Sequence, residues 1–494
     1  MKKVFAVFLS ILTVVTAFCA CKKESPNSKE SKDSSNLASN EYIPDVPNSD
    51  FSGATFTVMC RDPEMGWGEL AIVTDEESTT VLGDASYKRN RRLENDYHIK
   101  MDFVTYNDAG ASGDSFYQTL FQNLQAYDDI CDICIPGIID AATLTAANAF
   151  YDLSSGDVPY VNLEQPWWNH SLNESIAILN RQYFAISDAL LNDKLDTYVM
   201  FFNKTLFADN NLEEPYALVD SGEWIFDAFA NIVKTYGSDV NGNDSPDYED
   251  RFGFVGFIYD VFYVGSGVKG AILNKETGLP EMTRFSDKID DIYQKSYALI
   301  KGTDPYYTYS VGQETLYNGD VNDTFAAAFD TKSLFMCGPL MFYFNIITDM
   351  ASDVGVLPCP KYDEDQSGYH HRAGYNGATA MTVLTTVRNV ERAGIILEAF
   401  CAESKNYISP AFYETLLTNR YAQDEESKRM ISLIIETEEF DLDQIYRWGA
   451  ILESLQGALA MGQKSIASLY GRYITAAETK LTETVDSFKA LQEK

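Results

Sequence analysis

The order of strands and helices in the first third of the chain limits the folds available to it. Strands are expected at 54–60, 99–104 and 130–135, and helices at 86–97, 115–126 and 139–147. Strands that alternate with helices at this spacing build a parallel sheet with crossover helices. In open sheets of this kind, ligands bind outside the carboxyl ends of the strands. We therefore expect an α/β fold with ligand loops at 61–67 and 136–140.

Length, composition and charge exclude several classes of protein. The chain has 494 residues, of which 45% are apolar, so it can build two or three domains with large cores. Its formal net charge of −35 repels phosphate backbones, so we expect no nucleic-acid partner. Beyond the N-terminal segment, no continuous apolar run is long enough to cross a membrane.

The N-terminal segment indicates where the protein resides. Residues 1–20 combine a basic start, a short apolar run and small residues, which is typical of a secretory signal peptide. Phe18-Cys19-Ala20-Cys21 resembles the bacterial lipobox, which predicts a lipid on Cys21. Residues 22–50 are polar and would form a flexible tether. We expect a body lipid-anchored at the extracellular face of the cytoplasmic membrane; the alternative is an ordinary secreted protein with two incidental cysteines.

Six cysteines remain after the first two. Cys131 and Cys134 have CxxC spacing, but they lie in a segment that alternates like a strand. In a strand, positions i and i+3 point to opposite faces, so we do not expect a redox or zinc pair. Buried thiols are predicted, and a disulfide between Cys60 and Cys134 is left open.

Pro166-Trp167-Trp168 brings two indole rings side by side. Each ring offers a flat apolar face and one N–H donor, which suits a sugar ring with its hydroxyl rim. The alternative is that both indoles fill a gap between lobes.

The segment DVNGNDSPDYED has the spacing of a calcium-binding loop. Oxygen-bearing side chains at loop positions 1, 3, 5, 9 and 12, with a backbone carbonyl at position 7, match an EF-hand loop. The departures are a glycine at position 4 instead of 6, and Asp in place of Glu at position 12. A structural Ca²⁺ is expected, and a solvated acidic turn is the alternative. The proposed ligands are Asp239, Asn241, Asn243, Ser245, Asp247 and Asp250.

Two further motifs resemble ligand sites, but the surrounding sequence argues against a bound nucleotide or metal at them. Gly265 to Gly270 matches GxGxxG, but no phosphate-binding helix follows, so a glycine-rich loop bordering the cleft is favoured over a nucleotide site. His370 and His371 are adjacent and would face opposite ways in an extended chain, which argues against a shared metal.

Later segments resemble a known family. Thr197 to Asn203 leads into Asn-Lys before a helix, Ser333 to Leu340 ends in a Gly-Pro turn, and Val354 to Lys361 carries the pattern LP-P. Together with the order of elements, these resemble the extracellular solute-binding proteins of ABC transporters that take up sugars. Leu340 departs from the family, because some of its sugar binders carry a stacking Trp there.

The resemblance implies a fold of the periplasmic-binding-protein type II class, with two α/β lobes joined by a multi-pass hinge. The first lobe would comprise 51–187 and 372–425, and the second 188–371 and 426–494. The protein would be no enzyme: it would capture a neutral sugar or oligosaccharide by hinge closure, as a monomer, and deliver it to the permease of an ABC importer.

The ligand contacts expected from the loops and from the resemblance are aromatic rings and hydroxyl-binding carboxylates. They are Asp62, Trp67, Asp140, Trp167, Trp168, Asp188, Tyr375, Asn376 and Trp448. Two alternatives use the same features. One is a secreted carbohydrate-active enzyme with a carboxylate pair, and the other is a solute-binding sensor for a signalling kinase.

Overall fold

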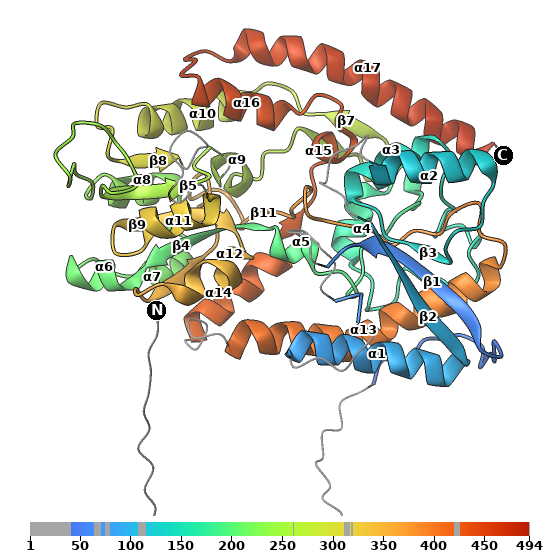
Figure 1. The fold of residues 1–494 in the computed structure, drawn as a ribbon. Helices are drawn as coiled ribbons and strands as arrows, with labels where there is room; N and C mark the ends of the chain where they lie inside the picture. The colour runs from blue at the N-terminus through green and yellow to red at the C-terminus, as the bar shows by residue number, and fades with distance from the viewer. Residues whose placement is uncertain are drawn as a thin grey trace, which may run out of the picture. The chain divides into compact units, whose positions relative to one another are not determined.

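Two separate β-sheets organise the chain (Figure 1). The computed structural model describes residues 41–63, 71–74, 80–106, 115–259, 261–310, 317, 320–418 and 425–493. The predicted signal peptide, Cys21 and Trp67 lie outside these ranges. Within them, no helix has the length and apolar character that a membrane span requires.

The first sheet has the order β2-β1-β3 and is parallel throughout. Its strands are β1 (Ala54–Arg61), β2 (Ile99–Tyr106) and β3 (Ile133–Cys134), and the helices that alternate with them are α1 (Val81–Tyr97), α2 (Ser115–Ala126) and α3 (Ile138–Ala146). The predicted alternation is confirmed. Thr80 fixes the start of α1, because its side chain accepts a hydrogen bond from the Gly83 N–H.

The chain returns to the first sheet after residue 377. Isolated bridges pair Thr382 with Cys134, Thr379 with Gly137, and Met381 with Ala185. The long helix α13 (Val390–Thr418) then packs along α1. The side chain of Arg89 lies over the ring of Phe400, 4.0 Å from its centroid, which joins the two helices.

The second sheet is mixed. Its order is β10-β4-β9-β5-β8, and only β4 is antiparallel to its neighbours. The strands are β4 (Tyr198–Asn203), β5 (Phe252–Gly256), β8 (Thr308–Ser310), β9 (Ser333–Pro339) and β10 (Val354–Leu357). The helices in this part of the sequence are α6 (Lys204–Asp209), α7 (Tyr216–Ser221), α8 (Phe226–Val233), α9 (Val261–Gly265), α10 (Asp287–Ile300), α11 (Val321–Phe329), α12 (Phe342–Asn345) and η4 (Ile347–Asp349).

Short elements connect these parts, and helices end the chain. They are α4 (His170–Ile176), η1 (Ile178–Asn180), α5 (Asn192–Leu195), β6 (Ala271–Leu273), β7 (Pro280–Met282), β11 (His371–Arg372), α14 (Glu425–Glu436), β12 (Glu438–Glu439), α15 (Leu442–Tyr446), α16 (Ile451–Ala460) and α17 (Ala467–Gln492). Among them, β11 and β12 pair in parallel, and β6 and β7 form an antiparallel hairpin.

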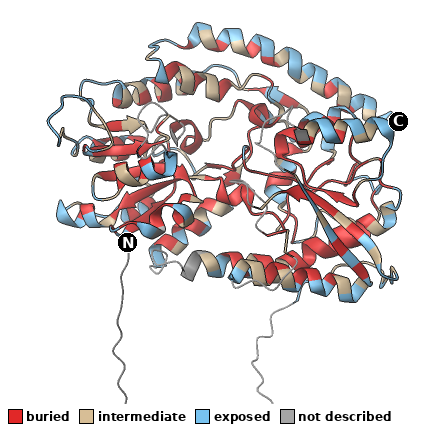
Figure 2. Cartoon of the chain, in the orientation of Figure 1, coloured by how far each residue is buried: buried red, intermediate tan, exposed pale blue. Residues whose placement is uncertain are grey.

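The buried residues fill both sheets and the helix faces turned toward them (Figure 2). In the second sheet, Phe335 packs against the rings of Trp224 and Phe229 at 5.8 and 5.1 Å between centroids. The predicted buried thiols are confirmed: the cysteines at 60, 131, 134, 337, 359 and 401 are all free and buried, so Cys60 and Cys134 form no disulfide.

Apolar residues at helical spacing predict one helix over 442–461, but the structure has two. Arg447 and Ala450 adopt left-handed backbone conformations, which break the helix between α15 and α16. The Asp443 carboxylate accepts hydrogen bonds from the N–H groups of Gly449 and Ile451, both at 2.6 Å, and so caps the start of α16.

The final helix contacts more than the second lobe that the sequence predicted for it. The Tyr470 hydroxyl donates to the Thr283 carbonyl, just after β7, at 2.8 Å. Toward the other end of α17, the ring of Phe488 meets Tyr183 edge-on at 5.4 Å. The helix α17 therefore contacts the β6–β7 hairpin near one end, and α3 and Tyr183 toward the other.

Candidate functional site

Residues 374–379 lie at the carboxyl ends of β1 and β3. The Arg61 guanidinium, at the end of β1, donates to the Gly377 carbonyl at 2.7 Å. The Ile138 N–H, which opens α3, donates to the Ala378 carbonyl at 2.9 Å. The Gly377 N–H donates in turn to Asp196, just before β4 of the second sheet, at 2.9 Å. This segment therefore joins the loops of the first sheet to the entry into the second, where ligands bind in open α/β folds.

Tyr375 presents the aromatic surface of this segment. The guanidinium carbons of Arg372 and Arg447 lie 5.4 and 6.0 Å from its ring centroid. Arg372 also lies 5.4 Å from the ring of Tyr198 in β4. We call Asp196, Tyr198, Arg372, Tyr375 and Arg447 the crossing site. The ring stacks on cations and leaves donors beside it, which can bind hydroxyl or carbonyl oxygens.

Close packing against Asp196 requires glycine at the position before Tyr375. A Cβ atom added at Gly374 would lie 2.1 Å from the Cβ of Asp196. Only glycine lets the backbone approach Asp196 this closely. Glycine at 374 thus brings the ring of Tyr375 toward the second sheet.

Buried polar atoms flank the crossing site. In the part of the chain that the structure describes, the amide atoms of Gln444, the hydroxyl of Tyr446 and one carboxylate oxygen of Asp193 have no hydrogen-bond partner. Buried polar atoms are paired in the great majority of cases. These three side chains, from α5 and α15, therefore keep donor and acceptor capacity for a further polar group.

Three buried charged side chains next to the crossing site, Lys194, Asp193 and Glu438, shift one another's pKa values. The Lys194 ammonium pairs with Asp193 at 2.9 Å. Burial lowers the pKa of Lys194, but the carboxylates of Asp193 and Glu438 outweigh it, so the net pKa is raised. Burial, and then the charge of Asp193, raise the pKa of Glu438 to about 8. The positive charge of Lys194 therefore acts on two buried carboxyl groups, those of Asp193 and Glu438.

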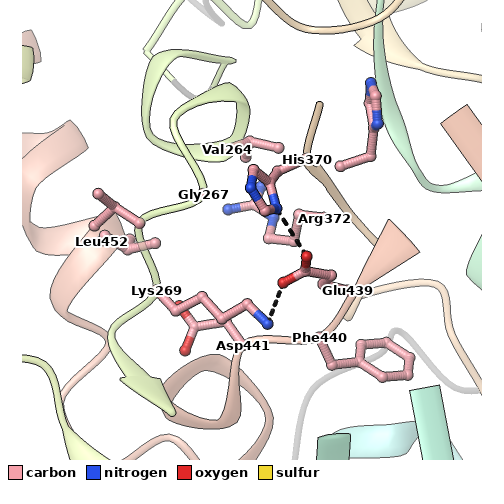
Figure 3. A pocket seen from close by; sticks show the side chains of 11 residues that line it. Val264, Gly267, Lys269, His370, Arg372, Glu439, Phe440, Asp441 and Leu452 are labelled. Carbon is pink, nitrogen blue, oxygen red and sulfur yellow. Dashed lines mark hydrogen bonds and ion pairs between the residues drawn. The ribbon is translucent and has the colours of Figure 1, made fainter. Parts of the chain in front are cut away.

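A second polar group lies on the strands next to the crossing site (Figure 3). Glu439 of β12 bonds to His370 at 2.8 Å and forms an ion pair with Lys269. Burial would raise the pKa of Glu439, but the hydrogen bonds and charges of these two partners lower it to about 2. Glu439 is therefore a fixed negative charge beside Arg372, its neighbour in the β11–β12 pair.

The glycine-rich loop owes its composition to packing against this group. Gly267 has φ +70°, and a Cβ there would lie 2.7 Å from the His370 ring. A Cβ at Gly270 would lie 2.6 Å from a carboxylate oxygen of Asp443. These contacts explain both glycines without a phosphate ligand.

The two adjacent histidines have separate partners. His371 is buried, its Nε2 accepts from the Cys359 N–H at 3.0 Å, and its Nδ1 bonds the Thr437 hydroxyl at 2.7 Å. Burial, and then the neighbouring His370, lower the pKa of His371 to about 3. Within the described ranges, no group of three or more His, Cys, Asp or Glu side chains is placed to hold a metal ion.

Four predicted ligand residues lie around residues 374–379. Tyr375 is nearly buried in the segment, and Asn376 is exposed beside it. Asp140 is buried in the first turn of α3, which the segment contacts at Ile138. Asp62 follows Arg61, and its N–H donates to the Tyr106 carbonyl at 2.9 Å.

The predicted Trp pair lies elsewhere, in the core. Trp167 and Trp168 are 2% and 3% exposed. Their indole N–H groups each donate to Glu398 of α13 at 3.1 Å. In this structure neither ring is exposed enough to stack on a sugar, which corrects the cleft placement; both rings pack in the core beside α13. Asp188 is beside them and pairs with Lys405 at 2.8 Å.

Trp448 is also buried, at 1% exposed. Its ring stacks on Tyr446 at 5.1 Å between centroids, and its N–H donates to the Thr484 hydroxyl of α17 at 2.8 Å. Trp448 is therefore not exposed for a cleft contact, whereas the guanidinium of its neighbour Arg447 lies near the ring of Tyr375. Sequence reasoning missed both arginines, because cation–ring contacts between residues far apart leave no local pattern.

The predicted calcium loop is ordered by its own side chains. The amides of Asn241 and Asn243 both donate to the Asp247 carboxylate, the shortest contact being 2.8 Å. Asp244, at loop position 6, has φ +58°, the conformation for which EF-hand loops use glycine. The two oxygens of Asp250 accept from the N–H groups of Val240 and Asp247 at 2.9 and 3.1 Å. The side chains at positions 3, 5 and 9 therefore lie together, but through amide N–H donors rather than through oxygens that converge on one point.

We compared the chain with protein-family models, curated proteins and solved structures. No protein-family model and no curated protein sequence matches the chain. Solved structures do: the chain shares its fold with proteins described as sugar-binding proteins or sugar transporters.

Three of the similar structures illustrate this. The sugar transporter protein of Rhizobium etli, in an open conformation, has a TM-score of 0.55 at 12% identity over 89% of this chain and 100% of that chain. The galacto-N-biose-/lacto-N-biose I-binding protein of Bifidobacterium longum gives 0.54 at 11%, over 88% and 99%. The maltose-binding protein MalE of Listeria monocytogenes gives 0.52 at 13%, over 88% and 98%. Two of them are named as binding proteins and one as a sugar transporter, and at 11–13% identity the likeness concerns the fold.

Proposed function

We propose that the protein is a lipid-anchored extracellular solute-binding protein that captures a neutral sugar or oligosaccharide and delivers it to an ABC importer. One observation carries the proposal. Residues 374–379 bring Tyr375 and the carboxyl ends of β1 and β3 together with Asp196 and Tyr198 at the entry to the second sheet. A solute bound there contacts both sheets at once.

The chemistry of the crossing site favours a polyhydroxylated solute. Tyr375 supplies a ring face, Arg372 and Arg447 supply donors, and Gln444 and Tyr446 retain unused donor and acceptor groups. Sugars combine apolar C–H faces with hydroxyls that both donate and accept. The similar proteins from Listeria and Bifidobacterium were solved with maltose and lacto-N-biose, which supports this solute class.

Binding would act by population shift. A solute that contacts both sheets binds most tightly when the two halves are closed, so it raises the closed fraction by its differential affinity. An importer would then recognise the closed form. The chain passages at 188–197 and 372–377 would flex in this motion, as part of the multi-pass hinge.

A sugar panel tests the proposal. Purified protein is screened by thermal shift and then titrated calorimetrically with neutral mono- and oligosaccharides. We expect at least one oligosaccharide to raise the melting temperature and to bind with 1:1 stoichiometry. Tyr375→Ala should weaken binding at least tenfold through loss of ring stacking. The matched control is Tyr127→Ala, which removes a ring that is 80% exposed. If no sugar binds, or if both variants lose binding equally, the assignment fails.

The same samples separate the two alternative functions. A stabilising sugar that chromatography recovers intact after long incubation supports a binding protein, whereas turnover would identify an enzyme. Capture of permease subunits by the sugar-loaded protein supports transport. Capture of a membrane kinase in their place would identify a sensor.

The lipid anchor at Cys21 is a separate proposal, based on the lipobox-like sequence. Cells fed a clickable fatty acid should label the wild-type protein and not Cys21→Ala. The variant should be recovered from the medium rather than from the membrane fraction. Label on Cys21→Ala, or none on the wild type, contradicts the anchor.

Structural calcium at 239–250 is the third part of the proposal. The ligand types, the proximity of the side chains at positions 3, 5 and 9, and the left-handed backbone at Asp244 support it. Ca²⁺ should raise the melting temperature of the wild type, and chelation should reverse the change. Asp247→Asn should lose this response, while Asp209→Asn, a change in an exposed acid outside the loop, should keep it. A melting temperature indifferent to chelation contradicts a bound ion.

A further inference from the structure

A cavity lies between α4 and β6, next to the pocket that Arg372 of the crossing site lines. It holds about 280 Å³ and is lined on one wall by Ser171, Glu174 and Ser175 of α4. The opposite wall is formed by Ala271, Ile272 and Leu273 of β6. Figure 3 shows the adjoining pocket, which shares Lys269, Glu439 and Phe440 with this one.

The lining combines an apolar floor with a polar rim. The floor is built from Phe440, Leu442 and the side chains of β6. The rim carries two ammonium groups, Lys269 and Lys275, and two carboxylates, Glu174 and Glu439. The formal charges cancel, so no ion of either sign gains net attraction. A neutral ligand with one apolar face and several hydroxyls matches this surface.

The volume sets the size of the ligand. Drug-sized ligands occupy pockets of roughly 300–1,000 Å³, and this cavity is at the lower limit of that range. It has room for one sugar ring and not for a chain of rings. We propose that the cavity between α4 and β6 is a second site, for a neutral, monosaccharide-sized polyol.

The position of the cavity couples it to the crossing site. Trp168, two residues before α4, is bridged to Ser187 in the segment that enters the first passage between the sheets. Glu439 pairs with Arg372 in the β11–β12 register, and Arg372 lies over Tyr375. A polyol held between α4 and β6 therefore touches Glu439, which is paired with Arg372 of the crossing site. Binding at the two sites should be linked, and the linkage must be reciprocal.

Calorimetry and ligand-observed NMR with a panel of neutral monosaccharides test the second site on the full mature chain. We expect saturable binding of at least one monosaccharide that survives Tyr375→Ala. Ser175→Trp, which fills the cavity, should weaken it at least tenfold. The matched control is Ser487→Trp: both serines are half-buried in helices and bond back to a backbone carbonyl, Ser175 at 2.7 Å and Ser487 at 2.9 Å.

Glu174→Gln is a second test of the site, to be used in case Ser175→Trp does not fold. It removes one rim carboxylate from an exposed position and should also lower monosaccharide affinity severalfold while the melting temperature stays unchanged. The second site is refuted if no monosaccharide binds at tens of millimolar. It is also refuted if binding is lost in Tyr375→Ala but kept in Ser175→Trp and Glu174→Gln. Oligosaccharide binding at the crossing site is measured separately, so the two assignments fail independently.

Discussion

Glu398 accepts hydrogen bonds from two buried tryptophans, and replacing it by Gln should give a stability gain that grows as the pH rises. Burial raises the pKa of Glu398 to about 7, although the Asn162 N–H and the two indoles donate to its carboxylate. The folded state therefore binds this proton more tightly than the unfolded chain, where the pKa is near 4.5. The extra stability is fully present below about pH 4.5 and is lost as the pH rises through about 7.

The magnitude follows from the two pKa values. A difference of about 2.5 units corresponds to about 3 kcal/mol, at 1.36 kcal/mol per unit. Gln resembles the protonated acid, because it offers one acceptor and one donor group. Glu398→Gln should therefore match the wild type near pH 4.5 and be more stable by up to about 3 kcal/mol at pH 8. Glu398→Ala also removes the titrating group but leaves buried indole N–H groups unpaired, so it should be less stable than Glu398→Gln by about 2 kcal/mol or more at both pH values.

Urea unfolding followed by tryptophan fluorescence measures both variants at the two pH values. Glu391→Gln is the control, because Glu391 is exposed on the same helix and should shift little at either pH. If Glu398→Gln is destabilised at pH 8 by as much as Glu398→Ala, the indoles stabilise the carboxylate more than burial opposes it, and the reasoning is refuted.

Three further predictions concern Asp443, His371 and Phe488. Asp443→Ala should lower the unfolding free energy by about 2 kcal/mol, measured by urea titration, because three N–H groups at the start of α16 lose their acceptor; an unchanged midpoint would contradict the cap. His371 should stay neutral at pH 5 in nitrogen NMR, because burial lowers its pKa to about 3, and a doubly protonated ring at that pH would contradict this. Stability linked to His371 should fall as the pH drops from about 6.5 toward 3. Phe488→Ala should cost about 3–5 kcal/mol in thermal or chemical unfolding, since it empties a buried contact between α17 and Tyr183; a loss below 1 kcal/mol would show that α17 is not tied there.

Local patterns predicted local structure well. The alternating strands and helices of the first sheet follow from periodicity and turn residues in short windows. The order of the second sheet does not, because pairing β4 with β9 joins residues more than a hundred positions apart. Sequence pattern cannot rank such distant pairings.

The errors have the same origin. Trp167 and Trp168 read as exposed ring platforms because their acceptor, Glu398, is more than two hundred residues away. The single helix predicted for 442–461 fails because the Asp443 side chain caps a new start, which helix periodicity does not reveal. Tyr375 was predicted from the returning strand, whereas Arg372 and Arg447 come to it from other segments.

Hydrogen exchange with and without an oligosaccharide that stabilises the protein tests the central claim most directly. A solute bound between the two sheets should slow exchange in residues 372–379 and 136–140 together, and in 192–198 across from them. Tyr375→Ala should remove the effect. Protection confined to one sheet, or no protection in any of these three segments at saturating sugar, would contradict the account.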